Sequence, residues 1–168
     1  LPLLQADSRS GGFFNSPLVD ADGRLRRLPL VLSYGDQLYE HFALAAVRTL
    51  LGKPPLEFVT GAGYRDTPHG QRVETVRVGG VFAIPIDDQG AVWVPYRGPR
   101  GSFPYLSASA VLHRQADPPQ LAGAIVLMGA TAAGLSDLRA TPLQDVYPGV
   151  EINANLIAGI LDQSFKYP

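Results

Sequence analysis

The sequence of 168 residues contains no cysteine. This absence excludes disulfide bonds, thiolate metal sites and cysteine catalysis. An excess of one charge is also missing, because 14 Lys and Arg stand against 15 Asp and Glu, so the chain has no general attraction for nucleic acid or for an anionic membrane. No apolar run approaches the length that crosses a bilayer, and no signal peptide opens the sequence. We therefore expect the chain itself to be soluble.

Residues and motifs that carry catalysis are scarce. The three histidines, His41, His69 and His113, have no supporting pattern of a serine or acid partner. Gly129 to Gly134 have the spacing of a phosphate-binding loop, but Leu135 occupies the position of its essential lysine. Paired-histidine metal motifs and a dinucleotide fingerprint are absent as well. We therefore predict no catalytic residue, no metal site and no cofactor, and we expect that the chain itself is not an enzyme.

The richest stretch of the sequence runs from Gly123 to Leu161. Ala124 to Met128 form a short unbroken apolar run, which is typical of a strand that is covered on both faces of a parallel sheet. A long loop of Gly129 to Pro148 follows, and Val150 to Asp162 have the apolar spacing of a helix. We therefore expect an α/β fold with a mostly parallel sheet and helices on both faces.

The middle of the chain predicts an antiparallel addition to that sheet. Val73 to Val78, Val81 to Ile86 and Ala91 to Tyr96 have the composition of strands, and Gly79-Gly80 is a two-residue hairpin signal. These three segments predict an antiparallel meander. Adjacent turn residues Asp87 and Asp88 point apart, which favours a role in the turn over a metal site.

The amino-terminal part predicts one helix. Asp36 can cap a helix that runs to Leu51, in which His41 lies on the polar, solvated face. A turn at Asp20 to Gly23 precedes three arginines in four positions. These arginines indicate either a solvated strand face or a clamp for an anion.

Short motifs spread over the whole chain resemble one known family, the CHASE domain of the second type. These motifs are Gly12-Phe-Phe-Asn15, Asp20-Ala-Asp-Gly-Arg-Leu-Arg-Arg-Leu-Pro-Leu30, Ala43-Leu-Ala-Ala-Val-Arg48, Ile84-Pro-Ile-Asp87, Val94-Pro-Tyr-Arg-Gly98, Phe103-Pro-Tyr-Leu-Ser107, Val126-Leu-Met-Gly-Ala-Thr131, Asp137-Leu-Arg-Ala-Thr-Pro142 and Tyr147-Pro-Gly-Val-Glu-Ile-Asn-Ala-Asn155. The family consists of extracytoplasmic sensor domains attached to bacterial adenylate cyclases, histidine kinases, serine/threonine kinases and diguanylate cyclases.

The resemblance implies a single sensor domain over residues 1–168 that lies outside the cytoplasm, as part of a plasma-membrane receptor. It implies that the chain meets the membrane only through segments outside it. It also implies that the family's first strand–helix units are absent, so that the chain is a fragment of the domain. The family often has histidine where this chain has Asn153, and no role of that histidine is carried over. The alternative is a fragment of a soluble α/β enzyme whose catalytic residues lie outside this chain.

A sensor needs a site whose occupancy biases a packed element tied to the membrane. The carboxyl-terminal helix is the natural output element, and Asn153 lies on its apolar stripe, where a buried amide must be hydrogen-bonded. We expect Asn153 to tie this helix to the loop that carries Asp137 and Arg139. Thr131 and Arg97, in the two long loops, complete the candidate ligand-binding residues. The expected partners are an unknown small-molecule or protein signal and a second copy of the chain in a homodimer, without nucleic acid.

Overall fold

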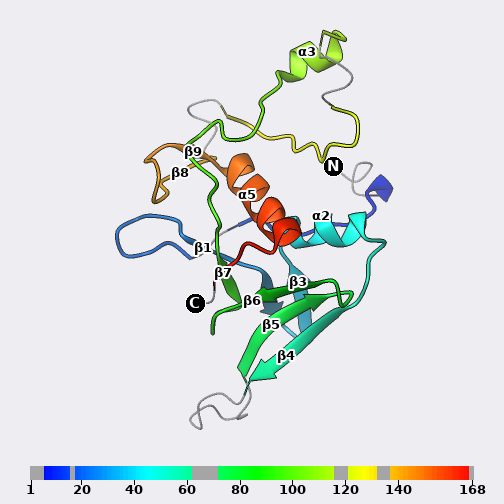
Figure 1. Ribbon diagram of the computed structural model, residues 1–168, viewed down its shortest axis with the longest axis vertical. Helices are drawn as coiled ribbons and strands as arrows, with labels where there is room; N and C mark the ends of the chain where they lie inside the picture. The colour runs from blue at the N-terminus through cyan, green and yellow to red at the C-terminus, as the bar shows by residue number, and fades with distance from the viewer. Residues whose placement is uncertain (1–5, 16–17, 62–71, 116–120, 132–136, 167–168) are drawn as a thin grey trace.

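The computed structural model describes residues 6–15, 18–61, 72–115, 121–131 and 137–166. Two helices lie side by side in the body of the molecule, with small antiparallel sheets around them, and a long arm that carries a third helix extends away from this body (Figure 1). The fold is therefore mixed α and β. The expected mostly parallel sheet is not confirmed, because every strand pairing among the described residues is antiparallel, apart from one parallel bridge between Phe13 and His41.

Three short strands follow the first turn. β1 (Arg27–Pro29) pairs with β7 (Ala91–Trp93), whereas β2 (Val31–Tyr34) and β3 (Gln37–Glu40) form a hairpin. Gly35, at a φ of 59°, lies in the turn of this hairpin. The expected helix cap at Asp36 is wrong because Asp36 belongs to the same turn, so the helix begins only after the second strand has ended.

A three-stranded sheet follows in the order β4 (Leu56–Gly61), β5 (Arg72–Val78) and β6 (Phe82–Pro85). Gly79 and Gly80 turn the chain between β5 and β6 with φ angles of 56° and 70°, so the predicted hairpin is confirmed. Its loop also includes Val81, because Val78 pairs with Phe82, and the expected two-residue turn is therefore wrong. The buried face of this sheet consists of branched aliphatic side chains, namely Val76, Val78 and Ile84.

The sequence predicted that the meander continues into a third strand. That strand, β7, does not join the three-stranded sheet and pairs instead with β1. The Asp87 side chain explains the change of direction. Its carboxylate accepts hydrogen bonds from the backbone of Gln89 and Ala91, both at 2.9 Å, and the Arg27 guanidinium of β1 donates to it at 2.8 Å. The predicted turn role of Asp87 is confirmed, and the same residue brings β7 to β1.

The helices that lie wholly within the described residues are α2 (Phe42–Leu50), α3 (Ala108–Leu112) and α5 (Gly149–Asp162). α2 packs against α5, and the two helices share one hydrophobic core with the strands. This core contains Leu28, Leu30, Leu44, Val47, Val76, Ile84, Val92, Tyr147, Ile152, Leu156 and Ile160. None of the helices in the described ranges combines the length and apolar character that crossing a membrane requires.

Helix α5 confirms the helix predicted from Val150 to Asp162. It ends at Gln163, which has a left-handed φ of 53°. The Gln163 side chain accepts a hydrogen bond from the Ala83 backbone of β6 at 2.9 Å and donates one to the Ile160 carbonyl at 2.9 Å. The last turn of the helix is thereby fastened to the edge of the three-stranded sheet.

The predicted central strand at Ala124 to Met128 is wrong. This segment is extended but forms no β-ladder with any described residue, and Val126 and Met128 are 65% and 92% exposed. An apolar run becomes a buried strand only when neighbouring strands supply hydrogen-bond partners on either side. Among the described residues no strand pairs with it.

The three arginines after the first turn are paired with aspartates. Arg26 binds Asp20 at 2.7 Å and Asp22 at 2.6 Å, and Arg27 binds Asp87 at 2.8 Å. Arg24 donates to Asp145 at 2.8 Å and also to the Thr141 carbonyl. These side chains hold the turn to the rest of the fold, so the structure favours a structural role over an anion clamp.

Candidate functional site

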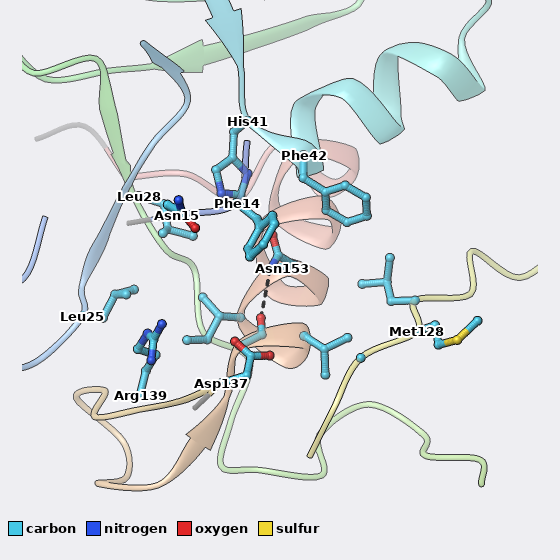
Figure 2. Close-up of a pocket in the computed structure, with 15 residues that line it drawn as sticks. Phe14, Asn15, Leu25, Leu28, His41, Phe42, Met128, Asp137, Arg139 and Asn153 are labelled. Carbon is cyan, nitrogen blue, oxygen red and sulfur yellow. Dashed lines mark hydrogen bonds between the residues drawn. The ribbon is translucent and has the colours of Figure 1, made fainter. Parts of the chain in front are cut away.

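A cavity of about 330 Å³ lies at the first turn of α5 (Figure 2). Five separate stretches of the chain contribute to its wall, in addition to the helix itself. Figure 2 shows His41 and Phe42 on one side, Asp137 and Arg139 on the opposite side, and Asn153 of α5 between them. The remaining wall residues are Phe14, Asn15, Leu25, Leu28, Leu127, Met128, Gly129, Gly149, Val150 and Ile152.

The chain segments around the cavity pack closely on the first turn of α5. A Cβ atom on Gly129 would lie 2.6 Å from the Cβ of Val150, and one on Gly149 would lie 2.2 Å from a carboxylate oxygen of Asp137. Larger residues at either position would push the two segments apart. The Gly149 amide also donates to the Asp137 carbonyl at 2.8 Å, and β8 (Leu138–Arg139) pairs with β9 (Tyr147–Pro148). The loop therefore forms one wall of the cavity and is joined to the helix.

His41 is the most deeply buried polar residue of the cavity wall. Its exposed fraction is 0%, which contradicts the expectation of a solvated side chain, because it caps α2 and does not lie on the helix surface. The Ala43 amide donates to Nδ1 at 3.1 Å, and the Phe13 ring packs edge-on against the imidazole at 5.3 Å. Burial lowers the pKa of His41 to about 4, so the ring is neutral at pH 7. Its Nε2 atom has no partner among the described residues.

Asn153 lies on the cavity side of α5. Its Nδ2 donates to the Gly149 carbonyl of the preceding turn at 3.0 Å, as the dashed line in Figure 2 shows. The expected tie to the loop of Asp137 and Arg139 is wrong, because an amide four residues after a carbonyl on the same helix reaches that carbonyl first. The Oδ1 of Asn153 is buried and finds no partner among the described residues.

The other candidate residues divide between two places. Asp137 and Arg139 line the cavity together with Asn153, whereas Thr131 does not line it. Arg97 lies elsewhere, where its guanidinium donates to Asp162 and stacks at 5.5 Å over the Phe103 ring. The structure therefore brings three of the five candidates to one site.

The face of α5 away from the cavity carries a second polar cluster that sequence reasoning missed. Glu151 is 2% exposed and accepts hydrogen bonds from the Gly101 amide at 2.9 Å and the Tyr105 hydroxyl at 2.6 Å. Asn155 is fully buried, accepts from the Arg97 amide at 2.8 Å and donates to the Tyr147 hydroxyl at 3.0 Å. These bonds attach the arm to α5. Two polar residues, Glu151 and Asn155, lie four positions apart in an otherwise apolar helix. This spacing could have indicated a polar cluster on one face of the helix.

No three His, Cys, Asp or Glu side chains gather as a possible metal site within the described parts of the chain. The cavity instead has a mostly apolar wall with a few polar atoms, which is the usual composition of a site for a small organic molecule. The polar groups of the wall include the buried, neutral imidazole of His41 and the amide of Asn153.

The family model described as the CHASE2 domain matches residues 3–168, so this chain belongs to the CHASE2 family. CHASE2 domains are extracellular sensor domains of signalling receptors, and they are not catalytic modules. No curated protein and no solved structure gave a match. The resemblance seen in the short motifs is therefore confirmed over essentially the whole chain.

Proposed function

We propose that this chain is the extracytoplasmic sensor domain of a membrane-bound receptor, that it binds a small-molecule signal in the cavity, and that α5 relays occupancy towards a cytoplasmic output domain. The observation that carries this proposal is the position of the cavity on the first turn of α5. A ligand there contacts the helix directly, together with the loop of Asp137. An output domain such as a cyclase or a kinase, with membrane segments outside this chain, belongs to the same proposal.

A relay of this kind requires that the ligand prefers one arrangement of the helix over another. The cavity wall links ligand contacts to the position of the helix, since Asp137 and Gly149 are joined by a backbone hydrogen bond and would move together. Membership of the CHASE2 family favours this sensor over a fragment of a soluble enzyme.

The proposed ligand site predicts a specific loss of binding when the cavity is filled. A thermal-shift screen of small anions, nucleotides, amino acids, sugars and divalent metals should identify a compound that binds the domain. That compound should raise the melting temperature of the domain in proportion to the logarithm of the compound's concentration. Replacing Val150 by tryptophan fills the cavity and should abolish that rise. Replacing the exposed Gln89 by leucine is the control and should preserve it. A hit that persists unchanged in Val150→Trp would place the binding site elsewhere.

We also propose that the domain works as a homodimer through the extended segment Ala124 to Met128. Ile125, Val126 and Met128 form a run of exposed apolar side chains, and such a run on an extended backbone favours pairing with another chain. Val126→Lys should convert the dimer into a monomer in analytical ultracentrifugation, with the melting temperature nearly unchanged. Val81→Lys, at an exposed hairpin position, is the control. A monomeric wild type at 100 µM, roughly the concentration that weak dimers need, would contradict this proposal.

A further inference from the structure

We propose that the cavity at the first turn of α5 binds the zwitterion of a free α-amino acid with an apolar side chain. In this arrangement Asp137 binds the ammonium group and Arg139 binds the carboxylate. The inference deepens the proposed function and rests on it, because it takes the cavity to be the signal-binding site. It is carried by the two opposite charges that one short strand brings to a wall that is otherwise mostly apolar.

The side chains of Asp137 and Arg139 project from the same face of the chain. β8 pairs with β9, and the hydrogen bond from the Gly149 amide to the Asp137 carbonyl extends this ladder by one residue. Side chains two positions apart on an extended strand lie on one face, with their Cα atoms roughly 6.6 Å apart. The cavity wall follows this alternation, because Asp137 and Arg139 line it and the intervening Leu138 does not.

The half-buried carboxylate of Asp137 lies over the start of α5. A Cβ atom on Gly149 would be 2.2 Å from the Oδ1 atom of Asp137, so the lack of a side chain at Gly149 leaves room for this carboxylate. The basic side chains of the described ranges form no ion pair with it. A negative charge in a largely apolar wall is stabilised by a cation, and the ammonium group of an amino acid supplies one beside the helix.

Arg139 supplies the matching positive charge. Its side chain is exposed and lines the cavity, so a ligand can reach it. The guanidinium donates to the Leu138 carbonyl at 3.2 Å, and its five N–H groups allow it to hold a carboxylate in addition to its contacts within the chain. Arginine binds carboxylates through two parallel hydrogen bonds. An α-amino acid carries both of its charged groups on one carbon atom, so side chains of one strand face can bind the two groups together.

The rest of the wall selects the side chain of the ligand. Figure 2 shows Phe42 across the cavity from Asp137 and Arg139. Aliphatic side chains complete the wall, namely Leu25, Leu28, Leu127, Val150 and Ile152. A charged ligand side chain would lose its hydration against these residues without meeting an opposite charge, whereas an aliphatic or aromatic side chain would bury apolar surface there.

The charged pair also selects against ligands that carry a single charge. A carboxylate without an ammonium group would bind Arg139 but be repelled by Asp137, and an amine without a carboxylate would bind Asp137 but be repelled by Arg139. A zwitterion satisfies both side chains and adds no net charge to the cavity.

Three compounds of nearly one shape test this inference on the full chain at pH 7 by isothermal titration calorimetry. Leucine carries both charges, isoamylamine is leucine without its carboxylate, and isocaproate is leucine without its ammonium group. We expect leucine to bind at least about tenfold more tightly than either analogue, which corresponds to about 1.4 kcal/mol. Free lysine and free glutamate keep the zwitterion but add a charged side chain, and they should also bind at least about tenfold more weakly than leucine.

Two variants should give a crossed pattern that loss of folding would not produce. Asp137→Asn should weaken the binding of leucine about tenfold, but it should not weaken isocaproate, because it removes the repulsion. Arg139→Gln should weaken leucine about tenfold, but it should not weaken isoamylamine, for the same reason. Gln89→Leu, in an exposed turn, is the control and should change none of these affinities.

The outcomes separate this inference from the proposed function. Equal affinities for leucine and its two analogues, or the absence of the crossed pattern, would overturn the inference and leave the cavity as a binding site. The inference alone would also be wrong if leucine did not bind but another compound of the thermal-shift screen bound the wild type and not Val150→Trp. If no compound binds the folded wild type, or if every compound that binds also binds Val150→Trp unchanged, the inference and the proposed function are both wrong.

Discussion

Replacing Glu151 by alanine should lower the free energy of unfolding by about 3 kcal/mol, because its carboxylate is the shared acceptor of the arm. The change leaves the Gly101 amide and the Tyr105 hydroxyl without their partner on α5. It also removes a negative charge from the first turn of the helix, where the helix dipole favours one. The melting temperature should fall by roughly 6 to 12 °C for a domain of this size.

Two further variants show whether this loss comes from the buried cluster. Glu57→Ala removes an exposed carboxylate of β4 and should change stability by less than about 0.5 kcal/mol. Tyr105→Phe removes one donor, and the loss on combining it with Glu151→Ala should be smaller than the sum of the two single losses. The idea that this carboxylate holds the arm would be contradicted if the losses in free energy of unfolding were additive in the double variant. It would also be contradicted if Glu151→Ala lost no more stability than Glu57→Ala.

Acidification from pH 7 to pH 4 should destabilise the fold by about 3 kcal/mol through His41 alone. Burial lowers its pKa from 6.5 in the unfolded chain to about 4 in the folded one. The unfolded state therefore binds the proton first, and the stability that is fully present above pH 6.5 is lost as the pH falls towards 4. A difference of 2.5 pKa units corresponds to about 3 kcal/mol. Chemical denaturation at half-unit pH intervals measures this loss.

The matched variants for this prediction are His41→Asn and His113→Asn. Asparagine at position 41 keeps a good helix cap but has no group that titrates in this range, so the pH dependence between 7 and 4.5 should become much flatter. His113 is exposed at the end of α3, and its replacement should leave the wild-type dependence intact. His41→Asn also loses packing against Phe13, which lowers the free energy of unfolding at every pH. The comparison therefore uses the slope of the free energy of unfolding against pH, and not its value at one pH. Equal slopes in all three proteins would show that His41 is not the titrating group.

Local patterns predicted the parts of this fold whose stability is local. The apolar stripe of α5, the Gly79-Gly80 turn and the turn at Asp87 were all read correctly from neighbouring residues, because short-range geometry determines them. The segment Ala124 to Met128 was predicted wrongly, because the same apolar run fits a buried strand or an exposed extended chain. Only the presence or absence of neighbouring strands distinguishes these two states, and the residues of the run do not determine whether such strands pair with it.

The candidate site was predicted only in part for a similar reason. Asp137, Arg139 and Asn153 were selected because the loop and the helix adjoin each other in sequence. His41 joins them from 96 to 112 positions earlier in the sequence, and its role depends on the hairpin that delays the start of α2. A Gly-Asp turn between two β-rich runs was the signal that would have placed His41 at the cap and not on the helix face.

The attachment of Gln163 to Ala83 limits how α5 can move. Axial sliding of the helix would break this bond, whereas tilting about its last turn would preserve it. Fourteen residues make a rod about 20 Å long, so a tilt of about 5° displaces the cavity end by about 2 Å. In the proposed relay, the sheet edge would act as a pivot, and a signal received at the first turn would leave the domain as a change of angle.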